Sequence, residues 1–386
     1  MTRKTTTAAN RSFPSSLLNG LAESHLPGLD GLRMVAVFLV VFYHFGFVAV
    51  PGEHGVLAFF VLSGFLITWL LLKEEEQFGS ISLNLFYARR ALRIFPAFYC
   101  YWLLLTGYLI IRDKPIVWEQ ALSSLVYVNN YYQALLGDPN TSYSHTWSLA
   151  IEEQFYLLWP FCFIALGFTR WRIAFLTALI VGIWIYRGVL EYMSPANQGY
   201  IYEAFDTRAD HLGIGCLLAV LLHSGRMGGL WRRLCTIPVS LVTLALLAVS
   251  VALYQIYGWP YRDVVGFALD PLLVAVLIVQ VISLRNSWLW SWLNWRWMTY
   301  LGALSYSIYL YHQVGVGLGE KIFAAYSLPL PIVGALTVLI AVAACSYHLV
   351  ERPFLRLKKL AARPLAGARK IAPGPMGTEE RLIEVP

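Results

Sequence analysis

Apolar residues form long runs along the whole chain, and charged or turn-forming residues separate one run from the next. A helix of about 20 apolar residues is long enough to cross the hydrocarbon core of a bilayer. The pattern therefore predicts an all-α integral membrane protein with about ten transmembrane helices. Their expected ranges are approximately 33–51, 55–72, 94–111, 149–168, 172–190, 210–223, 236–257, 264–284, 298–316 and 330–351.

The basic residues predict the orientation of these helices. With the N-terminus in the cytoplasm, 23 of the 29 Lys and Arg residues fall in cytoplasmic segments or at the cytoplasmic ends of helices. Basic residues are enriched on the cytoplasmic side of membrane proteins. We therefore expect ten spans with both termini cytoplasmic. The net charge of +7 is then a topology signal, and no nucleic-acid partner is expected.

Composition excludes several other classes. Of 386 residues, 58% are hydrophobic and only 13% are charged, which is incompatible with two or three soluble domains or with a disordered chain. The five cysteines include no CxxC pair, so we expect neither a disulfide framework nor a metal site. HExxH, GxSxG and nucleotide P-loop motifs do not occur in the sequence, which leaves metalloprotease, serine hydrolase and P-loop ATPase without support.

We divide the chain into three regions. Residues 1–25 are expected to form a basic cytoplasmic N-terminal arm, residues 26–358 a ten-helix membrane domain, and residues 359–386 a basic disordered cytoplasmic tail that contacts anionic lipid. The segment 112–148 is rich in Tyr and Asn, and we expect it to fold as an interfacial or re-entrant piece on the outer side.

Ionisable residues inside membrane helices are rare and mark functional sites. Arg33 and His44 are eleven residues apart, so on a helix they share one face and lie about 16 Å apart along its axis. That separation suits a phosphate-bearing cofactor with a long thin arm. Asp30 is expected to cap the helix, and Gly28 and Gly31 to leave N–H groups open for an anion. The alternative is that Arg33 anchors the topology and His44 packs with a hydrogen bond.

Two carboxylates enter the outer end of the fourth predicted span. Glu152 can share a face with His145, whereas Glu153 points about 100° away. From the rise per residue, contact between Glu152 and His44 is geometrically allowed, and a carboxylate is the usual partner for a histidine general base. The alternative is an interfacial carboxylate that reaches water.

Arg90 and Arg93 lie in a segment, 86–96, that we expect to be an inward loop ending at Pro96. They are one helical turn apart and form a pair suited to phosphate. The alternative is that they are orientation signals and lipid contacts.

Weaker candidates are also present. His312 either lines the same cavity or packs with a hydrogen bond, and Gly64, with Ser63, is expected to permit close helix approach. A charged cluster, which we expect in a solvated loop at the outer rim or in contact with a polar acceptor, comprises Asp206, Arg208, Asp210 and His211.

Seven segments together resemble the acyltransferase 3 family of bacterial membrane O-acyltransferases. They are 28–33 with His44, 59–67, 90–96, 145–159, 207–210, 305–312 and 351–354, and the likeness runs from about residue 26 to 358. The resemblance implies a multi-pass enzyme of the bacterial cytoplasmic (inner) membrane. It implies transfer of an acyl group, usually acetyl, from cytoplasmic acyl-CoA to a hydroxyl of an envelope polysaccharide, lipopolysaccharide, peptidoglycan or small glycoside.

The resemblance also implies residue roles. Arg33 and His44 match the family's Arg-x10-His motif, Arg90 and Arg93 its paired-arginine motif, and Glu152 the carboxylate of its Trp-Ser-Leu-x-x-Glu stretch, while Glu153 falls where that pattern is looser. We therefore expect His44 and Glu152 to be catalytic and Arg33, Arg90 and Arg93 to bind the acyl-CoA phosphates, with no metal.

The expected partners are a carbohydrate or glycoside acceptor, membrane lipid and proteins of envelope polysaccharide assembly. The rival interpretation is a proton-coupled transporter or flippase, since ten spans with buried His and Glu describe such a carrier too. A third is a purely structural membrane partner.

Overall fold

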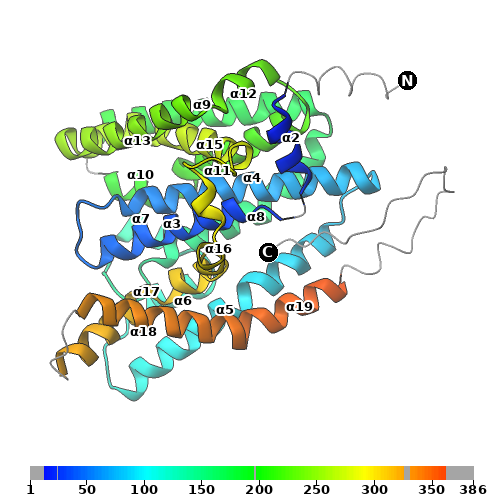
Figure 1. Cartoon of the computed structure of the whole chain (residues 1–386). Coiled ribbons are helices and arrows are strands. Elements are labelled where there is room, and N and C mark those ends of the chain that lie inside the picture. Colours follow the sequence, from blue (N-terminus) through cyan, green and yellow to red (C-terminus); the bar gives the residue numbers. More distant parts are fainter. Residues whose placement is uncertain (1–12, 24, 195–196, 326–330, 362–386) are drawn as a thin grey trace. The chain divides into compact units, whose positions relative to one another are not determined.

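The computed structural model describes residues 13–23, 25–194, 197–325 and 331–361, and within these ranges it contains helices and no β-strand (Figure 1). The chain divides into two compact units. The first contains residues 26–81 and 116–302 together with the N-terminal segment up to Ala22, and the second contains residues 82–115, the chain from Ala303 onward and the short piece 23–25.

The helices of the first unit are α2 (Ser15–Ala22), α3 (Pro27–His44), α4 (Gly52–Phe78), α6 (Trp118–Leu125), α7 (Asn129–Leu136), α8 (Thr146–Leu166), α9 (Thr169–Met193), α10 (Gln198–Glu203), α11 (Phe205–His223), α12 (Gly228–Leu234), α13 (Ile237–Tyr257), α14 (Trp259–Tyr261), η2 (Arg262–Gly266), α15 (Phe267–Ser283), η3 (Ser291–Asn294) and α16 (Arg296–Ala303). Those of the second unit are α5 (Leu83–Ile111), α17 (Ser305–Ala325), α18 (Pro331–Ser346), η4 (Tyr347–Glu351) and α19 (Arg352–Ala361).

The structure confirms an all-helical protein built for a membrane. Among the described residues, 8 helices are long and apolar enough to cross a bilayer, or up to 9 if the bent pair of 198–223 with α12 is one span. Each of the ten expected ranges overlaps a helix. The difference arises at two of the ranges. At 210–223, α11 carries charged residues. At 298–316, most of the range lies in α17, which is long enough to cross a bilayer but contains many polar residues. The orientation of the termini stays a prediction.

Glycines let α4 and α11 pack against each other at backbone contact. A Cβ atom added to Gly64 would lie 2.0 Å from the carbonyl oxygen of Leu212, and one added to Gly215 would lie 2.1 Å from that of Val61. Small residues allow such approaches in membrane proteins, where van der Waals packing drives helix association. The expectation that Gly64 permits close helix approach is confirmed.

Contacts along α4 fix the relative levels of its neighbours. α3 runs antiparallel to α4, since Tyr43 packs on Gly52 and Ala36 on Gly55. α8 runs parallel to α4, because Glu152 bonds Ser63 and, further along both helices, Trp159 bonds Thr68. α11 is parallel as well, with His211 against Phe60 and His223 near Trp69. Helix α4 is therefore the axis on which the site can be placed.

The regions outside the long helices show local order. Within the expected N-terminal arm, α2 is a helix with Leu17 and Leu21 buried, and its Gly20 packs on Ile282 of α15. The segment 112–148 contains the two short helices α6 and α7, as its expected interfacial fold allows. Most of the expected disordered tail, 362–386, lies outside the described residues.

Candidate active site

Arg33 and His44 lie on one unbroken helix, as the sequence predicts. α3 begins at Pro27 and ends at His44, so eleven residues of helix place the two side chains about 16 Å apart along the axis. Asp30 is not the N-cap, since that position is Leu26. Asp30 lies in the first turn instead, where its Oδ1 accepts a 2.9 Å hydrogen bond from Nη1 of Arg33. This bond orients the guanidinium group.

The glycines at the start of α3 serve packing. A Cβ atom on Gly31 would lie 2.2 Å from the carbonyl oxygen of Leu293, and one on Gly28 would lie 2.8 Å from Val281. η3 and α15 therefore press against the first turns of α3. The expectation that Gly28 and Gly31 present open N–H groups to an anion stays a prediction.

The hydrogen bond of His44 defines its tautomer. Nδ1 lies 2.8 Å from the carbonyl oxygen of Val40. A carbonyl oxygen only accepts hydrogen bonds, so Nδ1 must carry the proton. In the neutral ring Nε2 then holds the basic lone pair. His44 is in the last turn of α3 and its residue surface is exposed. The choice between a catalytic histidine and one that packs with a hydrogen bond stays a prediction.

Glu152 points into the helix bundle. Oγ of Ser63 donates a 2.7 Å hydrogen bond to its Oε1. Ser63 is eleven residues along α4 from Gly52, against which Tyr43 packs, a separation of about 16 Å on the helix axis. The pairing of Glu152 with His44 stays a prediction, and the helix levels favour an indirect link over a direct hydrogen bond.

Arg90 and Arg93 belong to the second unit. The segment expected as an inward loop is helical, because α5 begins at Leu83 and continues through Pro96. Arg90 lies over the ring of Phe86, with 6.0 Å from its guanidinium carbon to the ring centroid, and Arg93 is an electrostatic neighbour of Glu351. Both arginines are half-buried. Their joining with Arg33 in one phosphate site stays a prediction.

Two other polar residues of this unit have partners. His312 is fully buried, with Nδ1 2.6 Å from the carbonyl oxygen of Tyr309, so its packed alternative is the one observed. Glu351 accepts a hydrogen bond from Oγ of Ser307.

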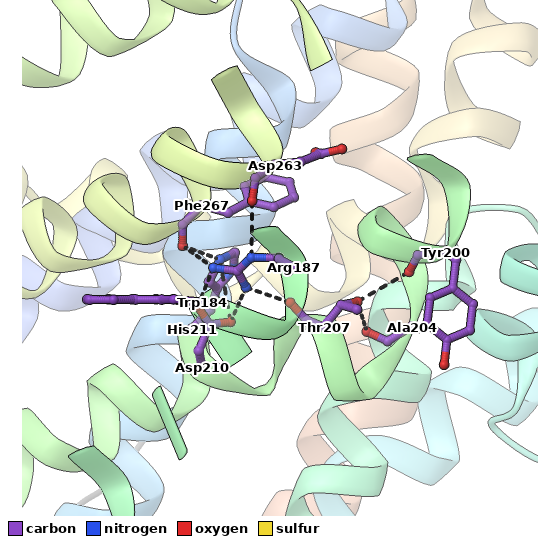
Figure 2. A network of polar contacts seen from close by, with 9 residues as sticks. All are labelled: Trp184, Arg187, Tyr200, Ala204, Thr207, Asp210, His211, Asp263 and Phe267. Atoms are coloured by element: carbon purple, nitrogen blue, oxygen red, sulfur yellow. Dashed lines mark hydrogen bonds and ion pairs between the residues drawn. The ribbon is translucent and has the colours of Figure 1, made fainter. Parts of the chain in front are cut away.

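The charged cluster on α11 is buried, which corrects the expectation of a solvated loop. Arg208, Asp210 and His211 each have no exposed surface. The carboxylate of Asp210 receives two hydrogen bonds from Arg187 of α9, of 2.7 and 2.8 Å. Figure 2 shows the Arg187 guanidinium between α11 and the helical segment that carries Asp263 and Phe267, whose carbonyl oxygens it also bonds.

Further ion pairs surround this cluster. Nε2 of His54 lies 3.0 Å from Oδ2 of Asp270. Nε of Arg262 donates a 2.7 Å hydrogen bond to Oδ1 of Asp263, and its Nη2 lies 2.6 Å from the same oxygen as an ion pair. Arg262 also lies 3.5 Å from Glu53. We call this set the buried charge network. It comprises seven buried residues, Arg187, Arg208, Asp210, His211, Arg262, Asp263 and Asp270, and two half-buried ones, Glu53 and His54. Arg187 and Arg262 are not among the candidates that the sequence analysis singles out. Their nearness to acidic residues in apolar runs was the signal that could have revealed the network.

At the edge of the network, Asp206 is held by two tyrosines. Its carboxylate accepts hydrogen bonds from Tyr131 at 2.9 Å and Tyr200 at 3.0 Å. Burial, and next the hydrogen bond to Asp206, raise the pKa of Tyr131 to about 12. Tyr131 is therefore a protonated donor at physiological pH, and it ties α7 to the start of α11.

A family model described as an acyltransferase domain matches residues 26–351. This range contains α3, α4, α8 and the five residues expected in the site. The chain belongs to the acyltransferase 3 family of membrane O-acyltransferases. The resemblance drawn from the sequence segments is confirmed.

Relatives of this acyltransferase 3 chain come from several bacteria. The Listeria monocytogenes peptidoglycan O-acetyltransferase OatA is 32% identical over 316 residues, which are 75% of this chain and 49% of OatA. YrhL of Bacillus subtilis, provisionally named a peptidoglycan O-acetyltransferase, is 31% identical over 359 residues, 85% of this chain and 55% of YrhL. The chain spans about half the length of these curated relatives. No solved structure matches the chain.

Proposed function

We propose that this acyltransferase 3 protein transfers an acetyl group from cytoplasmic acetyl-CoA to a hydroxyl of an envelope carbohydrate, with a peptidoglycan glycan as the first candidate acceptor. The names of its relatives support the acetyl group and the glycan. The membrane fold supports a reaction in which donor and acceptor approach from opposite sides.

The arrangement of Arg33 and His44 on α3 carries the proposal. About 16 Å of one helix separates a guanidinium group from an imidazole on the same face. Acetyl-CoA has phosphates at one end and a thioester at the end of a thin pantetheine arm. Arg33, with Arg90 and Arg93, would bind the phosphates, and the arm would run along α3 so that the thioester reaches His44. Arginine suits this role because its planar fork binds phosphate oxygens in pairs.

His44 is then the general base. With its Nδ1 proton committed to Val40, Nε2 takes the proton from the acceptor hydroxyl as the oxygen attacks the thioester carbon. A carbon–oxygen bond forms, the carbon–sulfur bond breaks, and the proton on His44 passes to the departing CoA thiolate. The products are the O-acetylated carbohydrate and free CoA.

Glu152 is proposed to support this proton transfer from a distance. Its carboxylate is anchored by Ser63 in the interior, about 16 Å along α4 from the residue that packs on Tyr43. A direct bond to His44 is therefore not part of the mechanism. A relay between Glu152 and His44 through intervening polar groups fits the geometry better.

Labelled acetyl-CoA tests the reaction. Membranes that contain the wild-type protein should incorporate label into envelope carbohydrate, whereas membranes without it or with folded His44→Ala should not. Equal labelling by wild type and His44→Ala would remove His44 from the mechanism. If neither protein incorporates label, while substrate flux follows a proton gradient, the carrier interpretation replaces the enzyme.

A further inference from the structure

Aromatic rings alternate with guanidinium groups from the surface of the first unit to its interior. The guanidinium carbon of Arg262 lies 4.1 Å from the ring centroid of Trp259 and 4.7 Å from that of Tyr202. Arg208 continues the series, 5.2 Å from Tyr202 and 3.8 Å from Phe267. Trp259 is 44% exposed, whereas Arg208 is fully buried. We call these five residues the aromatic–arginine ladder.

The outer end of the ladder lies at the boundary of two candidate spans. One ends at Tyr257 and the next begins at Trp259, so Trp259 stands where the chain turns back into the membrane. The distribution of basic residues predicts that this turn faces outward. Figure 2 shows the inner end, where Phe267 lies beside Arg187 of the buried charge network.

Several buried polar atoms beside the ladder have no hydrogen-bond partner within the described protein. They include all three side-chain nitrogens of Arg208, Oδ2 of Asp263, Oδ1 of Asp270 and Nδ1 of His54. Arg187 pairs with Asp210, Arg262 with Asp263 and His54 with Asp270, so Arg208 is the cation of this network that lacks a carboxylate partner among the described contacts. A buried polar group without a partner is destabilising, so a ligand that supplies the missing partners is favoured at this place.

The mixture of donors and acceptors identifies the class of ligand. A phosphate or carboxylate would satisfy Arg208 but would be repelled by Asp263, Asp270 and Glu53. A hydroxyl group both donates and accepts, so it can accept from Arg208 and donate to a carboxylate oxygen. Aromatic faces stack on the apolar face of a sugar ring, and cation–π contacts with arginine fix those faces in place. A sugar supplies both the hydroxyl groups and the apolar face.

We propose that the aromatic–arginine ladder binds a sugar residue of the acceptor, stacked on its aromatic rings, with a hydroxyl bridging Arg208 and Asp263. This rests on the proposed function in one respect, namely that the acceptor is a carbohydrate. Tyr202 is half-buried and lies between Arg262 at the exposed end of the ladder and Arg208 at the buried end. Its side chain must shift for the sugar hydroxyl to reach Arg208. The ladder adds an acceptor subsite that is separate from the donor residues on α3.

Steady-state kinetics with two substrates test the subsite. The purified full chain would transfer acetyl from labelled acetyl-CoA to soluble peptidoglycan fragments. Tyr202→Leu and Arg208→Met should each raise the KM for the fragments at least tenfold and leave the KM for acetyl-CoA within twofold. Tyr192→Leu is the matched control, because Tyr192 is an 89% exposed aromatic residue at the end of α9, and it should change neither constant.

Each outcome decides one claim. A folded Tyr202→Leu variant with an unchanged KM for the fragments overturns the subsite, even if its melting temperature falls, because the ladder is then structural only. If Arg208→Met does not fold, the KM of Tyr202→Leu for the fragments alone tests the subsite. If the wild type transfers no acetyl group, the proposed function has failed. The ladder is then tested by titrating N-acetylglucosamine oligosaccharides against tryptophan fluorescence, and absence of saturable binding overturns it.

Discussion

Removal of Arg187 should destabilise the first unit more than removal of a buried arginine whose carboxylate partner can reach solvent. Its guanidinium group bonds both carboxylate oxygens of Asp210 and the carbonyl oxygens of Thr207, Asp263 and Phe267. Arg187 and Asp210 have no exposed surface. In Arg187→Met the carboxylate of Asp210 stays buried without its counter-ion. Breaking one side of a buried ion pair costs about 3–5 kcal/mol, and we expect a loss of that size.

Arg172→Met is the matched control. Arg172 is buried as well and bonds Glu75 at 2.7 Å, but 36% of the Glu75 side chain is exposed, so this carboxylate can return to solvent. Because the Glu75 carboxylate can regain water when Arg172 is removed, we expect a smaller loss of stability than in Arg187→Met. The free energy of unfolding would be measured by titration with a denaturing detergent in mixed micelles, followed by tryptophan fluorescence.

A double variant separates charge burial from lost packing. Arg187→Met with Asp210→Asn removes both charges and leaves an acceptor for the indole N–H of Trp184, which bonds Asp210 at 3.0 Å. The double variant should regain at least half of the stability lost in Arg187→Met. The reasoning is refuted if the double variant is no more stable than the single one, or if Arg187→Met and Arg172→Met lose equal stability.

Three further predictions follow from local contacts. Gly64→Leu should abolish folded expression, because its Cβ would lie 2.0 Å from a backbone oxygen, whereas Gly107→Ala, with no atom within 4 Å, should express normally in a size-exclusion assay. Arg33→Lys should raise the Kd for acetyl-CoA about tenfold, measured by calorimetry. The charge is retained, but lysine cannot make the bidentate contact of arginine with phosphate. Tyr131→Phe should lower the unfolding free energy by about 1 kcal/mol in the detergent titration, since one hydrogen bond to Asp206 is removed.

The periodicity of apolar residues was enough to predict the fold class and the position of most helices. It also placed Arg33 and His44 on one helix, because a regular helix has a fixed rise per residue. The boundaries were less predictable. α5 begins before the apolar run, since Arg90 and Arg93 are good helix formers and Pro96 does not interrupt the helix.

Tertiary pairing was not readable from the pattern. Asp206, Arg208 and Asp210 look like a polar loop in sequence, yet α11 buries the last two against partners more than 20 residues away, including Arg187. A buried charge such as that of Asp210 is stabilised by distant residues that neutralise it or bond to it. For the same reason, the position of Glu152 along the bundle is defined by its hydrogen bond to Ser63 of α4. The residue spacing within α8 does not encode this contact.

The rate of acetyl transfer by a His44→Gln variant tests the central claim most directly. The protein would be reconstituted in vesicles with acetyl-CoA on one side and peptidoglycan fragments on the other, with His223→Gln as a control for a half-buried histidine at the far end of α11. We predict that His44→Gln lowers kcat by a factor of about 10²–10⁴, as expected for loss of a general base, while His223→Gln keeps the wild-type rate. A His44→Gln variant that transfers acetyl within threefold of the wild-type rate would contradict the account.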